Sequence, residues 1–189
     1  LGLTVLGFGV ALVVVDITIF NVAMPAIIAD LDLDLSAAAW VNAAYAVVFA
    51  TFLITLGRVG DLLGRRRLFL AGLIIFLAAS LSAAGSDSLR GLVASRALQG
   101  LGAAMILPAT LAIVNTTFRG RERAIAFGIW GSVIGGMAAV GPVLGGWLTT
   151  SFSWRWVFFV NVPIAVAAFI AAAAFVDESR GETTVGGFD

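Results

Sequence analysis

Six long runs of apolar residues, separated by short polar or glycine-rich stretches, cover most of the chain. A helix needs about 20 apolar residues to cross the hydrocarbon core of a bilayer. Because the connections are short, consecutive helices should be antiparallel neighbours. The pattern predicts an all-α membrane protein, a six-transmembrane-helix bundle over residues 1–180, with helices at approximately Gly2–Ile28, Ala37–Gly57, Leu68–Gly85, Leu89–Thr117, Ala124–Thr149 and Trp156–Val176.

The composition indicates a membrane protein and argues against nucleic-acid-binding proteins, metalloproteins and enzymes. Of the 189 residues, 61% are hydrophobic and 12% are charged, whereas an ordinary soluble domain has about 25% charged residues. The net charge is zero, which gives no basis for nucleic-acid binding. Cysteine and histidine are absent, so thiolate and zinc sites are not expected. Without a nucleophile–base pair, a phosphate loop or a metal cluster, we expect neither an enzyme nor a cofactor.

The arginines are distributed unequally between the two sides of the predicted bundle. Only Arg90 and Arg155 fall on one side. The other side, which holds both ends of the chain, has Arg58, Arg65, Arg66, Arg67, Arg119, Arg121, Arg123 and Arg180. The positive-inside rule therefore places both ends in the cytoplasm. An interfacial aromatic belt at the outer ends of the helices is expected from Trp40, Trp147, Trp154 and Trp156.

Asp16 lies inside the first apolar run, where a carboxylate costs on the order of 2.5–3.5 kcal/mol on insertion scales. Such a residue is either a structural polar group satisfied by a neighbouring helix or a proton- or ion-linked site of a transporter. Arg96 is the only basic residue well inside a predicted span, and Gln99 follows on the same helix face. At 1.5 Å per residue, Asp16 and Arg96 differ in depth by about 8 Å, so a contact is possible. Alternatively, Arg96 extends to the outer interface.

A glycine- and arginine-rich loop joins the second and third predicted helices. Gly57 can end a helix in the left-handed conformation, and Asp61 can pair with the arginines. An ordinary topogenic loop with turn glycines would look similar. However, the loop also resembles the signature of the major facilitator superfamily, with departures at Val59 and Leu62; the matching residues are Gly57, Asp61, Gly64, Arg65 and Arg66. The resemblance implies a conformational latch, in which Asp61 and Arg65 engage the partner half of the transporter in one state.

Two further motifs resemble the fourteen-helix drug:proton antiporter branch of that superfamily. The first helix has the pattern Asp-x-Thr-x-x-Asn-x-Ala-x-Pro from Asp16 to Pro25. In the fourth helix, Arg96 is followed by Gln99 and Gly100 as in the family's motif there. The resemblance implies proton coupling through Asp16 and Arg96. Thr18, Asn21 and Gln99 are the candidates for lining a cavity.

The fifth helix is unusually rich in glycine. Gly131, Gly135, Ala139, Pro142 and Gly146 share one face, and small residues at that spacing let a neighbouring backbone approach closely. The functional interpretation adds a hinge for alternating access, since Pro142 removes a backbone donor. The run resembles the superfamily's antiporter motif, with Met137 in place of one glycine; the matching residues are Gly128, Gly141, Pro142, Gly145 and Gly146.

The chain also shows a weak internal repeat. A shift of 89 positions aligns Arg66 with Arg155 and Phe69 with Phe158. Because each copy would hold three helices, an odd number, the second copy would cross the membrane in the opposite direction. The alignment therefore suggests a 3+3 inverted repeat. Together these resemblances imply the N-terminal half of a major facilitator fold, with residues 181–189 beginning a cytoplasmic linker to a second six-helix half.

The function that these features favour is proton-coupled efflux of drugs or small metabolites across a bacterial inner membrane by alternating access. The partners would be protons, a small-molecule substrate and the lipid bilayer. Two alternatives remain open. One is a uniporter or symporter of the same fold for a small nutrient. The other is a non-transporting six-helix membrane protein.

The predicted orientation can be tested with single introduced cysteines, because the sequence has none of its own. A cysteine at Ser36 should react with an impermeant thiol reagent added outside cells, and a cysteine at Leu62 should not. The opposite labelling pattern would refute the orientation inferred from the arginine distribution.

Overall fold

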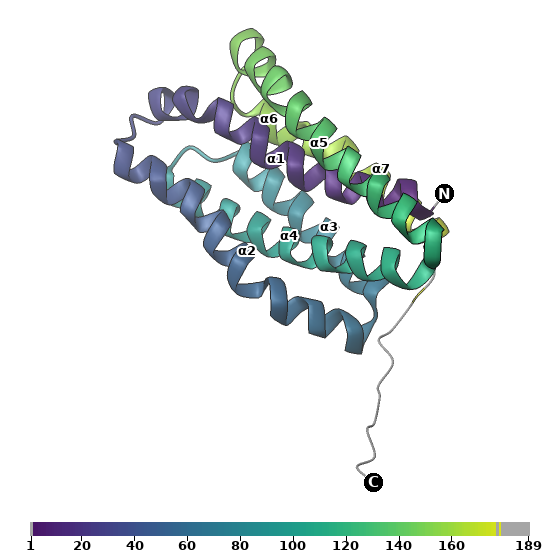
Figure 1. Ribbon diagram of the computed structural model, residues 1–189. Coiled ribbons are helices and arrows are strands. Elements are labelled where there is room, and N and C mark those ends of the chain that lie inside the picture. Colours follow the sequence, from purple (N-terminus) through teal and green to yellow (C-terminus); the bar gives the residue numbers. More distant parts are fainter. Residues whose placement is uncertain (1, 177, 179–189) are drawn as a thin grey trace.

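The computed structural model describes residues 2–176 and residue 178, and it is helical apart from short connections (Figure 1). The predicted linker at 181–189 lies outside the described residues. Among the described residues, six helical segments are long and apolar enough to cross a membrane, with α6 and α7 together forming the sixth. The predicted all-α architecture is thus confirmed, with the elements α1 (Gly2–Asp30), α2 (Leu35–Leu63), α3 (Arg65–Ala84), α4 (Leu89–Thr117), α5 (Gly120–Ser151), α6 (Trp156–Phe159) and α7 (Asn161–Phe175).

The packing of the helices repeats between the first three spans and the last three. α2 packs against α4 as α5 packs against α1, and α3 packs against α4 as α7 packs against α1. Two further pairs, α1 with α4 and α3 with α7, are equivalent to themselves when the two sets are exchanged. The start of α1 and the end of α7 lie at the same end of the bundle (Figure 1). This arrangement agrees with an inverted 3+3 repeat.

Two arginines that the repeat makes equivalent also make equivalent contacts. Arg66, at the start of α3, donates to the backbone carbonyl of Ala173 near the end of α7. Arg155, just before α6, donates to the carbonyl of Ser86 beyond the end of α3 at 3.4 Å and to Asp87 at 2.6 Å. Arg66 thus connects the start of α3 to the end of α7, and Arg155 connects the start of α6 to the end of α3. The two contacts lie at opposite ends of the bundle.

The boundary between α2 and α3 differs from the sequence prediction. α2 continues through Gly57 to Leu63, so the interpretation of Gly57 as the helix end is wrong. The residues after Gly57 include several good helix formers, and they extend the helix by almost two turns. Gly64 alone separates α2 from α3, with a φ of 115° that favours glycine. Its N–H closes the last turn of α2 onto the carbonyl of Gly60 at 3.0 Å.

The aromatic belt is only partly as predicted. Trp40, Trp147 and Trp156 are exposed on the bundle surface, which the predicted belt requires. Trp154 is instead only 3% exposed, and its indole N–H donates to Asp30 at the end of α1 at 2.8 Å. Trp154 is excluded from the belt because it packs between the ends of helices instead of facing lipid.

Gly100 lies where α4 approaches the backbone of α2 most closely. A Cβ added at Gly100 would lie 2.5 Å from the carbonyl oxygen of Tyr45, a backbone atom that cannot move alone. We predict that Gly100→Ala destabilises the purified protein by about 1–3 kcal/mol, because the two helices must move apart. Thermal unfolding in detergent is the measurement. Gly7→Ala is the control, since its Cβ would make an ordinary 3.7 Å contact with Val133. Equal melting temperatures for the two variants would contradict this prediction.

Candidate functional site

Asp16 and Arg96 form an ion pair in the interior of the bundle. Arg96 Nη1 donates to Asp16 Oδ2 at 2.6 Å, across the contact between α1 and α4. Asp16 is 2% exposed and Arg96 is 1% exposed. The contact that the depth comparison allowed is therefore observed, and the alternative in which Arg96 extends to the outer interface is wrong.

Further hydrogen bonds complete the surroundings of the Asp16 carboxylate. Gln99 donates from Nε2 to Oδ1 of Asp16 at 2.9 Å, and its Oε1 accepts from Arg96 Nη1 at 2.8 Å. Asn161, from α7, donates to the same Oδ1 at 2.7 Å. Ser80, from α3, accepts from Gln99 at 2.9 Å and links the group to a fourth element. One carboxylate thus accepts from three side chains that belong to two helices other than its own.

The Arg96 guanidinium is also enclosed by aromatic rings. Its central carbon lies 4.1 Å from the centre of the Phe20 ring and 4.4 Å from that of Tyr45. A desolvated contact of this kind stabilises a cation by about 2 kcal/mol. Loss of one partner from a buried ion pair costs more, about 3–5 kcal/mol, because the other charge is left uncompensated. Asp16 therefore remains the main compensation for the Arg96 charge.

Sequence reasoning found Asp16, Arg96 and Gln99 but missed two buried members of the group, Ser80 and Asn161. Ser80 could hardly be found, because serine is common in transmembrane helices and bonds to its own backbone, here to the Phe76 carbonyl. Asn161 carried a signal. It is the only amide, hydroxyl or charged side chain in the sixth predicted span.

A cavity of about 440 Å³ lies between α1 and α2 and reaches Arg96. Asn21 lines it as expected, and its Oδ1 lies 3.4 Å from the Asn42 amide nitrogen across the cavity. Thr18 and Gln99, the other cavity candidates, are not among its lining residues. The lining is mostly apolar and consists of Ile17, Asn21, Asn42, Ala43, Tyr45, Ala46, Phe49 and Arg96.

Thr18 and the α5 glycines meet on another face of α1. The Thr18 hydroxyl donates to the carbonyl of Val14 at 2.8 Å, and a Cβ at Gly141 would collide with the Thr18 side chain. A Cβ at Gly145 would lie 3.0 Å from the Ile19 carbonyl oxygen. These two glycines, and not the face that includes Gly131, allow the close approach of α1 and α5.

Other glycines of the α5 motif have open space beside them. A side chain at Gly128 or Gly146 would meet nothing within 4 Å among the described residues, and the same holds for Gly131, Gly135 and Gly136. Pro142 lies inside α5, and the helix continues through it. Within the described part of the chain, α5 therefore presents one glycine face to α1 and leaves a second glycine face uncovered.

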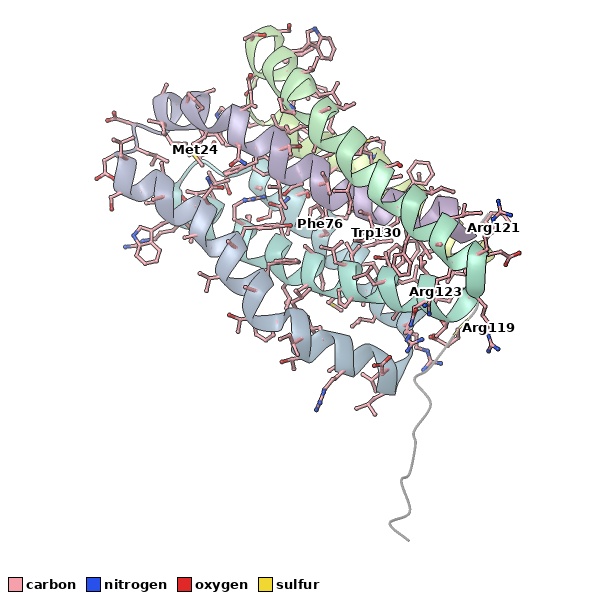
Figure 2. All side chains as sticks on the ribbon, in the orientation of Figure 1. Met24, Phe76, Arg119, Arg121, Arg123 and Trp130 are labelled. Carbon is pink, nitrogen blue, oxygen red and sulfur yellow. The ribbon has the colours of Figure 1, made fainter. Side chains whose placement is uncertain are left out.

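The residues of the glycine- and arginine-rich loop gather at the end of the bundle that holds the N-terminus. Asp61 and Arg65 form an i,i+4 ion pair of 2.7 Å, and Arg65 reaches the Ala112 carbonyl at 3.4 Å. The Arg66 backbone N–H donates to Glu178 at 3.1 Å, and a Cβ at Gly64 would collide with the same carboxylate. Figure 2 shows three more arginines of this end projecting around the start of α5: Arg119, Arg121 and Arg123.

Comparison with curated proteins finds relatives among bacterial resistance transporters. The chain is 43% identical over 180 residues to the puromycin resistance protein pur8 of Streptomyces alboniger, covering 95% of this chain and 36% of that protein. It is 38% identical over 181 residues to the tetracenomycin C resistance and export protein of Streptomyces glaucescens, covering 96% and 34%. The chain thus spans about a third of the length of these relatives.

Solved structures show the same fold. The crystal structure of the peptide transporter POT in complex with sulfate superposes with a TM-score of 0.81 at 19% identity, covering 92% of this chain and 37% of that one. The sequence model of the Major Facilitator Superfamily matches residues 6–188. The chain is therefore a multi-pass membrane protein that belongs to the major facilitator superfamily, a family of transporters and not of enzymes.

Proposed function

We propose that the chain forms the first six-helix half of a proton-coupled exporter of small organic molecules. A second six-helix half would complete the transport path, and both ends of the described bundle would lie in the cytoplasm of a bacterial cell. The observation that carries the proposal is the Asp16–Arg96 ion pair, which is buried inside a membrane bundle and lies beside a cavity.

The proposed coupling follows from the electrostatics of that pair. Protonation of Asp16 removes the charge that compensates Arg96, which costs the paired arrangement about 3–5 kcal/mol. A shift of a two-state equilibrium from 1:99 to 99:1 takes about 5.5 kcal/mol. One proton can thus supply most of the free energy that separates two conformations. A proton taken up from outside opens the pair, and its release inside restores the pair.

The cavity indicates the class of substrate. Its lining offers two amides, Asn21 and Asn42, among apolar and aromatic side chains. Such a surface suits a largely apolar organic molecule that carries a few hydrogen-bonding groups. Puromycin, which occurs in the name of one relative, is the first compound to test.

The remaining motifs are given mechanical roles in this proposal. The uncovered glycine face of α5 would lie against the second half, where its smooth surface lets the halves rock. The Asp61–Arg65 pair would act as the latch between α2 and the partner half. Asp61 is half-exposed, and it is therefore available for such a contact.

The coupling role of Asp16 is tested by Asp16→Asn in the full-length protein. The amide keeps the shape of the side chain but cannot exchange a proton, so efflux driven by a pH gradient should fall to background while binding is retained. Everted membrane vesicles, in which export appears as uptake of puromycin added to the medium, provide the assay. Asp32→Asn is the matched control, because Asp32 is exposed in the loop between α1 and α2.

Arginine variants give a second arm of the same test. Arg96→Ala should impair efflux strongly, whereas Arg90→Ala, at an exposed position near the start of α4, should not. Uphill export by Asp16→Asn at the normal rate would leave Asp16 with a structural role only.

The latch is tested by Asp61→Asn. The pair is partly buried, with the Arg65 side chain 11% exposed and the Asp61 side chain 46% exposed. The amide oxygen of Asp61→Asn can still accept from Arg65, so we expect normal membrane insertion and thermal stability but slow transport. Glu122→Gln is the control, since it neutralises an exposed carboxylate at the same end of the bundle. Normal transport by Asp61→Asn would reduce the loop to a topogenic turn.

A further inference from the structure

Asn161 is a buried amide at the start of α7 that contacts Asp16 through its nitrogen. Its side chain is fully buried, and its nitrogen donates to Asp16 at 2.7 Å and lies 3.4 Å from the Ser80 hydroxyl. Its carbonyl oxygen has no hydrogen-bond partner among the described residues. A buried unpaired acceptor is unfavourable and requires an explanation. The amide gains from this position only through its nitrogen, whose short contact is with Asp16.

The local sequence explains how Asn161 reaches this place. Pro163 has no N–H to donate to the carbonyl of Phe159, four residues before it, so the helical hydrogen-bond ladder is interrupted. Val160, between α6 and α7, keeps helical backbone angles, with φ −59° and ψ −29°, so the two segments run on as one span and Asn161 is the first residue of α7.

Asn161 also connects Asp16 to α7, a helix other than the α4 helix that holds the other two donors. Arg96 and Gln99 both belong to α4, so Asn161 is the only direct donor to Asp16 from any other element in the described part of the chain. Besides Asp16 and Arg96 themselves, the titratable group that packs against the pair is Tyr45 of α2. α3 contributes the neutral Ser80, and α5 has no titratable side chain from residue 124 to 151.

We propose that Asn161 is a positioning residue of the proton site, which stabilises ionised Asp16 and ties the start of α7 to α1 while Asp16 is ionised. The inference rests on the proposed role of Asp16 in proton exchange. A hydrogen bond to a charged acceptor is roughly twice as strong as one to a neutral acceptor. Protonation of Asp16 weakens the contact, and the start of α7 is released from α1.

The test follows the Asp16 carboxyl directly by infrared difference spectroscopy of the purified full-length protein during a pH titration. The carboxyl band that Asp16→Asn removes reports Asp16. Asn161→Leu, which has nearly the same shape but no donor, should move the midpoint of this band to more alkaline pH by about one pH unit, the value of a hydrogen bond to a charged group. Asn115→Leu, at an exposed position on α4, should leave the midpoint unchanged.

A merely structural role would lower the thermal stability of Asn161→Leu without moving the midpoint, and that result would overturn the inference. If Asn161→Leu does not fold, Asn161→Asp replaces it. Two adjacent carboxyls share a proton, so the higher midpoint should again move to alkaline pH, and an unmoved midpoint would overturn the inference. Absence of any titrating band that Asp16→Asn removes would instead refute the proposed function itself.

Discussion

The buried ion pair between Asp16 and Arg96 is the constraint around which this bundle is organised. A membrane interior supplies no water to compensate either charge, so the pair must be satisfied by the protein. The surrounding packing serves that need. Phe20 and Tyr45 cover the guanidinium, and the close approach at Gly100 brings the backbone of Tyr45 against α4. The pair also sits at the contact of α1 with α4, the two helices that the repeat exchanges.

In the proposed mechanism, the position of the pair lets a small chemical change have a large mechanical effect. α1 and α4 each carry a pair of helices, since α5 and α7 pack on α1 while α2 and α3 pack on α4. A change at the pair therefore acts at the α1–α4 contact, about which the first three spans and the last three spans are related. At the two ends of the bundle, the equivalent contacts of Arg66 and Arg155 hold α3 and α7 together. In the proposed mechanism, these end contacts persist while the contact in the interior changes with the protonation of Asp16.

The sequence was informative wherever the membrane makes a residue expensive. Asp16 and Arg96 stood out because charges within apolar runs are rare, and their depths alone made a contact possible. The end of α2 was predicted wrongly, because Gly57 and Gly64 are both plausible helix ends and only Gly64 adopts a positive φ. Ser80 was missed because a serine can bond to its own helix backbone, here to the Phe76 carbonyl. Asn161 stood alone among the apolar residues of its span, but its partner is set by tertiary packing. The face of α5 that meets α1 was misassigned for the same reason.

The most direct measurement is the proton released when purified full-length protein binds a compound that the vesicle assay shows to be exported. A pH electrode in weakly buffered solution records it. If Asp16 is the exchanging group, the wild-type protein releases a proton on binding and the Asp16→Asn variant binds the compound without any release. Equal release from both proteins would show that the exchanged proton comes from another group, and would contradict the coupling role of the Asp16–Arg96 pair.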